Sequence, residues 1–249
     1  MLFMGSVMIK MNTSLALVLK QLTLQVLLLF ISTELCLANG SLVYSIDFSK
    51  QPEGDARPWL EKKGYILKLE ASEIDAKFYN NRLNLETKEQ KAGIFALKLA
   101  PENYLKNITS IDIEWGVIRQ PAGADWENGN NRVPVALMFF FGTKNISSGL
   151  PFGINSAPYF LSPFIGHNEV PGKVYTGNLY KEGGRYLCVA VSDGSEEVIK
   201  STIKIDPRYL KLFNKGKIPS LTAIAFQMNT EDTEGGASAF IRKLDFYAN

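Results

Sequence analysis

Residues 110–118, with the sequence SIDIEWGVI, decide which fold this chain is expected to adopt. Apolar side chains recur at every second position, and Asp112 and Glu114 lie between them. Successive side chains of a β-strand point to opposite faces, so this alternation predicts a strand with one buried and one solvated face. Residues 133–141 and 186–191 are apolar at nearly every position, which is typical of central strands covered on both faces.

Other segments repeat the period of two between turn residues, and they cover residues 42–48, 65–71, 94–100, 221–228 and 237–247. One short helix is predicted near residues 207–214. Asp206 suits the N-cap, Pro207 suits the first helical position, and Gly216 follows as a stop signal. Residues 149–172 are rich in Pro and Gly and are interpreted as a long loop.

Many short strands separated by turn residues predict an all-β protein, and we favour an antiparallel two-sheet sandwich of the jelly-roll type. A closed barrel is the alternative. No internal repeat or linker divides the chain, so residues 39–249 are expected to form a single β-sandwich domain.

Composition excludes several classes of protein. Of the 249 residues, 46% are hydrophobic and 21% charged, which differs from a disordered chain. The 27 basic residues balance 25 acidic ones, so no nucleic-acid partner is expected. Two cysteines and one histidine exclude a disulfide framework and a cluster of imidazole ligands.

Residues 1–38 are interpreted as a signal peptide. An apolar core at residues 22–31 is followed by Ala38, a small residue suited to the position before cleavage. Cleavage there places the protein in the periplasm or outside the cell, without a permanent membrane anchor. A retained anchor at residues 15–31 is the alternative, which Lys20 disfavours. Translation could begin at Met1 or Met11.

Several segments together resemble a known family. They are residues 111–115 (IDIEW), the polar loop 123–132, the apolar segment 133–140, and residues 223–233 followed by 239–240 and 245–246. In this order they resemble the exported bacterial family catalogued as domain of unknown function three-zero-four-seven. The resemblance implies export and a β-sandwich but no established activity. Where the family pattern has paired aspartates before the central strand, this chain has residues 129–132 (GNNR), and where the pattern has an Asp-x-Asp run near the end, it has residues 231–234 (EDTE).

The loop at residues 125–132 is the predicted ligand-binding site, with Trp126, Glu127, Asn131 and Arg132 as its ligand-contacting residues. An indole can pack on the apolar face of a sugar ring, while carboxylate, amide and guanidinium groups bind its hydroxyls. The alternative is a solvated hairpin loop whose tryptophan folds back onto the edge of the sandwich.

Asp47 and Asp245 form a predicted metal site. Asp47 lies in the first predicted strand and Asp245 in the last, and jelly rolls often bring their terminal strands together. Two carboxylates meeting there would repel unless a cation bound between them. Outward alternation on two separate strands explains both residues equally well. Calcium is also considered for the acidic loop at residues 229–236, and no other cofactor is expected.

These patterns support two functions of different classes. The favoured one is a non-catalytic cell-envelope protein that binds a glycan, a similar polar ligand or another envelope component. The alternative is a carbohydrate-active hydrolase or lyase, which needs two carboxylates about 5–9 Å apart. The candidates are Glu114, Glu127, Asp232 and Glu234, but none lies in a recognisable catalytic motif, so no catalytic residue is assigned.

Overall fold

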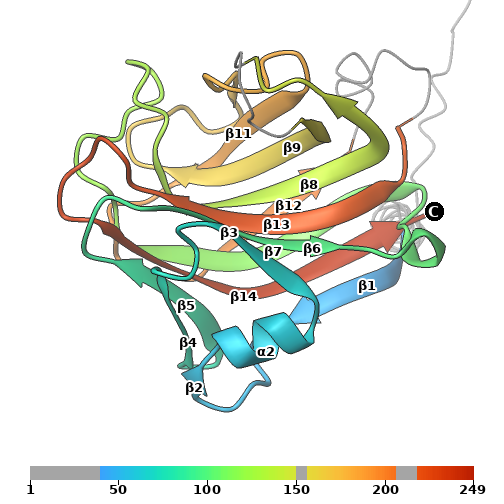
Figure 1. The fold of residues 1–249 in the computed structure, drawn as a ribbon, viewed down its shortest axis with the longest axis horizontal. Helices are drawn as coiled ribbons and strands as arrows, with labels where there is room; N and C mark the ends of the chain where they lie inside the picture. Colours follow the sequence, from blue (N-terminus) through green and yellow to red (C-terminus); the bar gives the residue numbers. More distant parts are fainter. Residues whose placement is uncertain (1–39, 150–155, 206–217) are drawn as a thin grey trace, which may run out of the picture. The chain divides into compact units, whose positions relative to one another are not determined.

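The computed structural model describes residues 40–149, 156–205 and 218–249. The predicted signal peptide at residues 1–38 and the predicted helix near residues 207–214 lie outside this described part. The described residues form two seven-stranded sheets, which we call sheet A and sheet B (Figure 1).

Sheet A contains the two ends of the described chain. Its strands follow the order β12 (Ile199–Lys204), β7 (Ile108–Arg119), β14 (Ala237–Ala248), β5 (Arg82–Thr87), β4 (Asp75–Tyr79) and β2 (Gly54–Asp55), and β1 (Ser41–Asp47) also pairs with β14. All these pairings are antiparallel. Figure 1 shows β1 and β14 side by side, which confirms that the first and last strands meet.

Sheet B contains the most apolar strands. Their order is β10 (Val174–Tyr175), β11 (Gly184–Val191), β9 (Ala157–Gly166), β8 (Val133–Ile146), β13 (Leu221–Asn229), β6 (Ala92–Lys98) and β3 (Tyr65–Leu69). One pair, β9 with β11, is parallel, and the others are antiparallel. The predicted all-β, two-sheet sandwich is therefore confirmed, with one parallel pair that the sequence did not predict.

The main core lies between the two sheets. It contains one buried tryptophan and many phenylalanines: Trp115, Phe48, Phe95, Phe139, Phe141, Phe226 and Phe246. Phe95 and Phe226, on neighbouring strands of sheet B, stack with ring centroids 4.9 Å apart. Burial of this apolar area is the main stabilising contribution to the fold.

The two kinds of strand predicted from hydrophobic patterns are both confirmed. On β7, Ile111, Ile113 and Trp115 are buried, and Asp112 and Glu114 between them are partly exposed. On β8, both faces are buried. Leu137 and Phe139 belong to the main core, while Ala136 and Met138 point to the opposite face of sheet B.

Some elements were not predicted. Helix α2 (Arg57–Lys62) has six residues, too few for a periodic pattern, and Pro58 lies at its start. Strand β9 lies within the segment that was interpreted as a loop, and that interpretation is wrong over residues 157–166. Pro158 and Pro163 gave the misleading signal, because proline lacks the N–H group that a sheet uses. Within the described residues, no helix is long and apolar enough to cross a membrane.

Candidate functional site

Trp126 lies on the side of sheet B that faces away from the main core, at one end of that sheet. Its side chain is only 6% exposed. The indole stacks on Phe164 with centroids 4.9 Å apart and contacts Tyr186 at 4.7 Å, and its Nε1 donates a hydrogen bond to the carbonyl of Arg132 at 3.1 Å. The expected exposed indole is therefore wrong, because these rings from β9 and β11 cover it. The folded-back alternative describes it correctly.

Glu127 and Arg132 are both engaged within the protein. The carboxylate of Glu127 accepts hydrogen bonds from the Tyr175 hydroxyl at 2.5 Å and from the Lys173 ammonium. The bonds from Lys173 and Tyr175 lower the pKa of Glu127 below its ordinary value. Arg132 donates to the carbonyl of Glu231 at 2.6 Å and pairs with Asp232. Arg132 thus joins the loop at residues 125–132 to the acidic loop at residues 229–236, and the sequence analysis treated these loops as separate sites.

Glu169 is a buried carboxylate that sequence reasoning missed. It is 4% exposed and accepts hydrogen bonds from the backbone N–H groups of Trp126 at 3.0 Å, His167 at 2.7 Å and Asn168 at 3.2 Å. These bonds attach the Trp126 loop to the turn that follows β9. Asn131, the fourth predicted ligand-contacting residue, is partly buried in the same loop.

A lysine lies between the two predicted metal ligands. On the paired strands β1 and β14, Asp47 lies opposite Lys243, and Asp245 lies opposite Ser45. The Lys243 ammonium is 2.6 Å from Asp245, and Ser45 donates to the same carboxylate at 2.7 Å. Lys243 thus supplies a positive charge at this position. The metal role of Asp47 and Asp245 stays a prediction.

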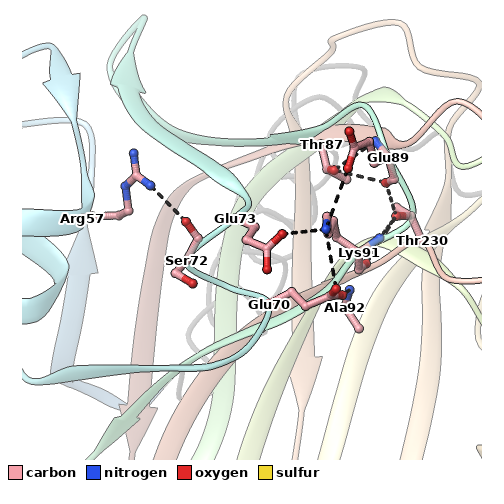
Figure 2. A network of polar contacts seen from close by, with 9 residues as sticks. All are labelled: Arg57, Glu70, Ser72, Glu73, Thr87, Glu89, Lys91, Ala92 and Thr230. Atoms are coloured by element: carbon pink, nitrogen blue, oxygen red, sulfur yellow. Dashed lines mark hydrogen bonds and ion pairs between the residues drawn. The ribbon is translucent and has the colours of Figure 1, made fainter.

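The acidic loop at residues 229–236 also has basic neighbours. Arg132 pairs with this loop, as described above, and Lys91 lies at its base (Figure 2). The Lys91 ammonium is 2.6 Å from Glu73, and its backbone N–H donates to the Thr230 hydroxyl at 2.8 Å. These contacts orient the loop through protein groups alone, and a calcium ion there stays a prediction.

Three of the four carboxylates proposed for catalysis are paired with cations. Glu114 on β7 is 3.1 Å from Arg242 and 3.5 Å from Lys200, while Glu127 and Asp232 pair with Lys173 and Arg132. Glu114 belongs to sheet A, whereas Glu127 and Asp232 lie in loops. No described contact brings two of these three carboxylates together.

The face of sheet B that points away from the core is an apolar surface that sheet A does not cover. We call it the outer face of sheet B, and on its five middle strands it is formed by Ile94, Ala96, Lys98, Ala136, Met138, Phe140, Phe160, Ser162, Phe164, Tyr186, Cys188, Ala223, Ala225 and Gln227. Trp126 covers one end of it. Ile94, Phe140, Tyr186, Ala223 and Gln227 remain partly exposed, and none of the residues forming this face is acidic.

Cys188 is a free cysteine, fully buried beside Trp126 and Phe164 on the outer face of sheet B. Burial raises the pKa of its thiol to about 11, so at neutral pH the group is a protonated, weakly reactive thiol.

Comparison with known proteins finds similarity in structure only. No protein-family profile and no curated protein sequence matches the chain. Among solved structures, a legume lectin-like domain from Entamoeba histolytica is 12% identical with a TM-score of 0.44, covering 84% of this chain and 99% of that one. The carbohydrate recognition domain of Emp46p, in a mutant form, is 12% identical with a TM-score of 0.41, covering 84% and 98%.

A family 29 carbohydrate binding module from Piromyces equi is 9% identical with a TM-score of 0.36, covering 82% of this chain and 91% of that chain. The structural neighbours named here are thus carbohydrate-binding modules and lectin-like domains. Since no family profile matches, the resemblance drawn from the sequence segments stays a prediction.

Proposed function

We propose that this protein is a non-catalytic binder of a neutral glycan, and that the glycan binds to the outer face of sheet B. The observation that carries this proposal is the composition of that face. It combines partly exposed aromatic rings with small side chains, and the second sheet of the sandwich does not cover it. An apolar face that keeps aromatic rings partly exposed is typical of a binding site.

Phe140 and Tyr186 supply the aromatic surface. Phe140 contacts the buried Phe160 with ring centroids 5.5 Å apart, and Tyr186 contacts the same ring at 5.7 Å, so both partly exposed rings pack against this neighbour on β9. The axial C–H groups of a pyranose can pack against such rings. Gln227 on β13 adds an amide that can both donate hydrogen bonds to and accept them from sugar hydroxyls.

The absence of acidic side chains among the residues of this face favours binding over hydrolysis. A glycoside hydrolase needs two carboxylates flanking the bond that it cleaves. Glu114 lies on sheet A, and Glu127 and Asp232 lie in loops, where a basic side chain engages each carboxylate. For the same reason the proposed ligand is neutral, since Lys98 is the sole charged residue of the face as defined above.

Export to the periplasm or the cell exterior is part of the proposal. It rests on the apolar core at residues 22–31 and on Ala38, and on the resemblance to an exported family. We expect mass spectrometry of the protein isolated from the cell envelope or the medium to find Asn39 at the amino terminus. An intact chain recovered from the cytoplasm would contradict export.

A binding assay with two variants tests the glycan site. Wild-type protein should bind a member of a panel of neutral oligosaccharides, such as cellohexaose, xylohexaose and mannohexaose. Phe140→Ala should weaken that binding about five- to tenfold through loss of the stacking surface. Tyr79→Ala is the matched control, because Tyr79 is an aromatic residue 55% exposed on sheet A. Equal affinities of the two variants, or no binding by wild type, would contradict the proposal.

A further inference from the structure

Ser162 lies in the middle of β9, on the outer face of sheet B, and it is fully buried. Its hydroxyl makes no hydrogen bond with any residue that the structure describes. Removing a hydroxyl group from water without giving it a partner destabilises a fold. In the described part of the chain, Tyr65 carries the other such hydroxyl, but Tyr65 belongs to the core between the sheets. Ser162 alone of the two faces the proposed ligand.

The strand register gives the neighbours of Ser162. Tyr186 on β11 is its direct partner. On β8, the pairs Ala136–Phe164 and Phe139–Leu161 place Met138 opposite Ser162. Along β9 itself, Phe160 and Phe164 are the next side chains on the same face. An apolar or aromatic side chain therefore lies on each of the four sides of the hydroxyl.

Tyr186 differs from the other three neighbours in its exposure. Met138 is 5% exposed, and Phe160 and Phe164 are fully buried, whereas Tyr186 is partly exposed. Its ring lies 4.7 Å from that of Trp126 and 5.7 Å from that of Phe160. Among the four neighbours, Tyr186 is thus the one that reaches the protein surface. A change in the rotamer of this one side chain would open a route to the hydroxyl without moving the sheet.

We infer that the Ser162 hydroxyl is a specificity-determining group of the glycan site, and that a ligand reaches it when the Tyr186 ring turns aside. This inference rests on the proposed glycan binding. A serine hydroxyl can donate one hydrogen bond and accept others, which matches a sugar hydroxyl that does the same. The surrounding rings exclude water, so the bond to the ligand replaces no competing bond to solvent.

The energetic asymmetry of the free and bound states explains how the site discriminates between ligands. Before binding, Ser162 has no partner to lose. After binding, a ligand with a hydroxyl at the matching position satisfies it, and a ligand without that hydroxyl leaves it unsatisfied. The first ligand gains a hydrogen bond at Ser162 that the second lacks, and this difference sets the preference between them.

Ser162→Ala separates this role from a structural one. Because the hydroxyl has no partner in the free protein, the variant should melt at the same temperature as wild type or above it. Its affinity for the oligosaccharide that wild type binds best, among cellohexaose, xylohexaose and mannohexaose, should fall about tenfold. Ser201→Ala is the matched control. Ser201 accepts a hydrogen bond from Nε1 of Trp115 at 3.1 Å, so this variant should melt lower and keep its affinity.

Each other outcome is decisive. Unchanged affinity of Ser162→Ala, with weakened binding by Phe140→Ala, would overturn the role of Ser162 and leave the proposed glycan site standing. A melting temperature lowered as far as in Ser201→Ala would mean that the hydroxyl has a structural partner, and it would also overturn the inference. If wild type binds none of the three oligosaccharides, the proposed function fails and the inference fails with it.

Discussion

The outer faces of the two sheets are built on the same pleat but carry opposite chemistry. On sheet A, one row of neighbouring positions across four strands reads Lys200, Glu114, Lys243 and Asp47, with alternating charge. On sheet B, a corresponding row reads Ala96, Ala225, Met138, Ser162 and Tyr186. Opposite charges on neighbouring strands stabilise a face that water covers. The row on sheet B contains no charged side chain and so no such ion pairs.

The one large aromatic residue buried on the outer face of sheet A sharpens this difference. Phe240 on β14 is fully buried, and the guanidinium of Arg82 lies 4.0 Å from its ring centroid. Arg82 also pairs with Glu196. A charged side chain, itself only 8% exposed, therefore covers the aromatic ring. On sheet B, aromatic rings cover one another, and Phe140 and Tyr186 remain partly exposed. The comparison supports sheet B, and not sheet A, as the location of the proposed binding surface.

Trp126→Ala has the largest expected effect, because it removes the main cover of one end of the outer face of sheet B. The indole is 6% exposed and contacts three other aromatic rings. We expect the free energy of unfolding to fall by about 3–5 kcal/mol, measured by urea denaturation. Leu42→Ala, at a side chain 54% exposed on β1, should change it by less than about 0.5 kcal/mol. Similar losses in the two variants would refute the packing of Trp126.

A pair of glutamates tests the contrast between the faces directly. Glu169→Ala leaves three backbone N–H groups beside sheet B without their buried acceptor, and it should cost about 2–4 kcal/mol. Glu114→Ala removes ion pairs to Arg242 and to Lys200, whose side chain is 76% exposed on sheet A, and it should cost about 0–1 kcal/mol. Thermal and urea unfolding of both variants measure this difference. Equal costs would mean that the two carboxylates are equally solvated.

The sequence predicted the fold well where one strand carries its own pattern. In β7, alternation within residues 110–118 identifies the buried and exposed faces without reference to any other segment. In β9, Ser162 and two prolines interrupt the apolar run, and the neighbouring strands β8 and β11 alone explain why the segment is extended. Tertiary pairing outweighed the local signal there.

The candidate site was less predictable, because its contacts join residues far apart in the chain. Trp126 was correctly singled out as unusual, but its burial depends on Phe164, Tyr175 and Tyr186, which lie on three other strands. Glu169 belongs to a loop with no motif, so no local pattern could mark its three hydrogen bonds. The apolar character of the segment at residues 133–141 did predict that both faces of β8 are covered.

The smallest expected effect concerns the pH dependence of Glu127. The hydrogen bond from Lys173 is the largest cause that lowers the pKa of Glu127 in the folded protein, and the hydrogen bond from Tyr175 is the second. Because the pKa of Glu127 is lower in the folded protein, its carboxylate stabilises the fold fully at pH values above the ordinary glutamate pKa of about 4.3. This contribution is lost as the pH falls through the lower pKa of the folded protein. The stability difference between wild type and Glu127→Gln should therefore be constant from neutral pH down to about 5 and then shrink toward lower pH.

An NMR titration of the Glu127 carboxyl carbon measures this pKa directly. We expect a midpoint below the ordinary value in wild type, and a return toward that value in Lys173→Met, which removes the first donor and the nearby charge. Tyr175→Phe removes the second donor and should return the midpoint by a smaller amount. A wild-type midpoint at or above the ordinary value would show that the bonds from Lys173 and Tyr175 do not stabilise the Glu127 carboxylate. The loop that carries Trp126 would then be attached to the 166–175 segment through Glu169 and the indole alone.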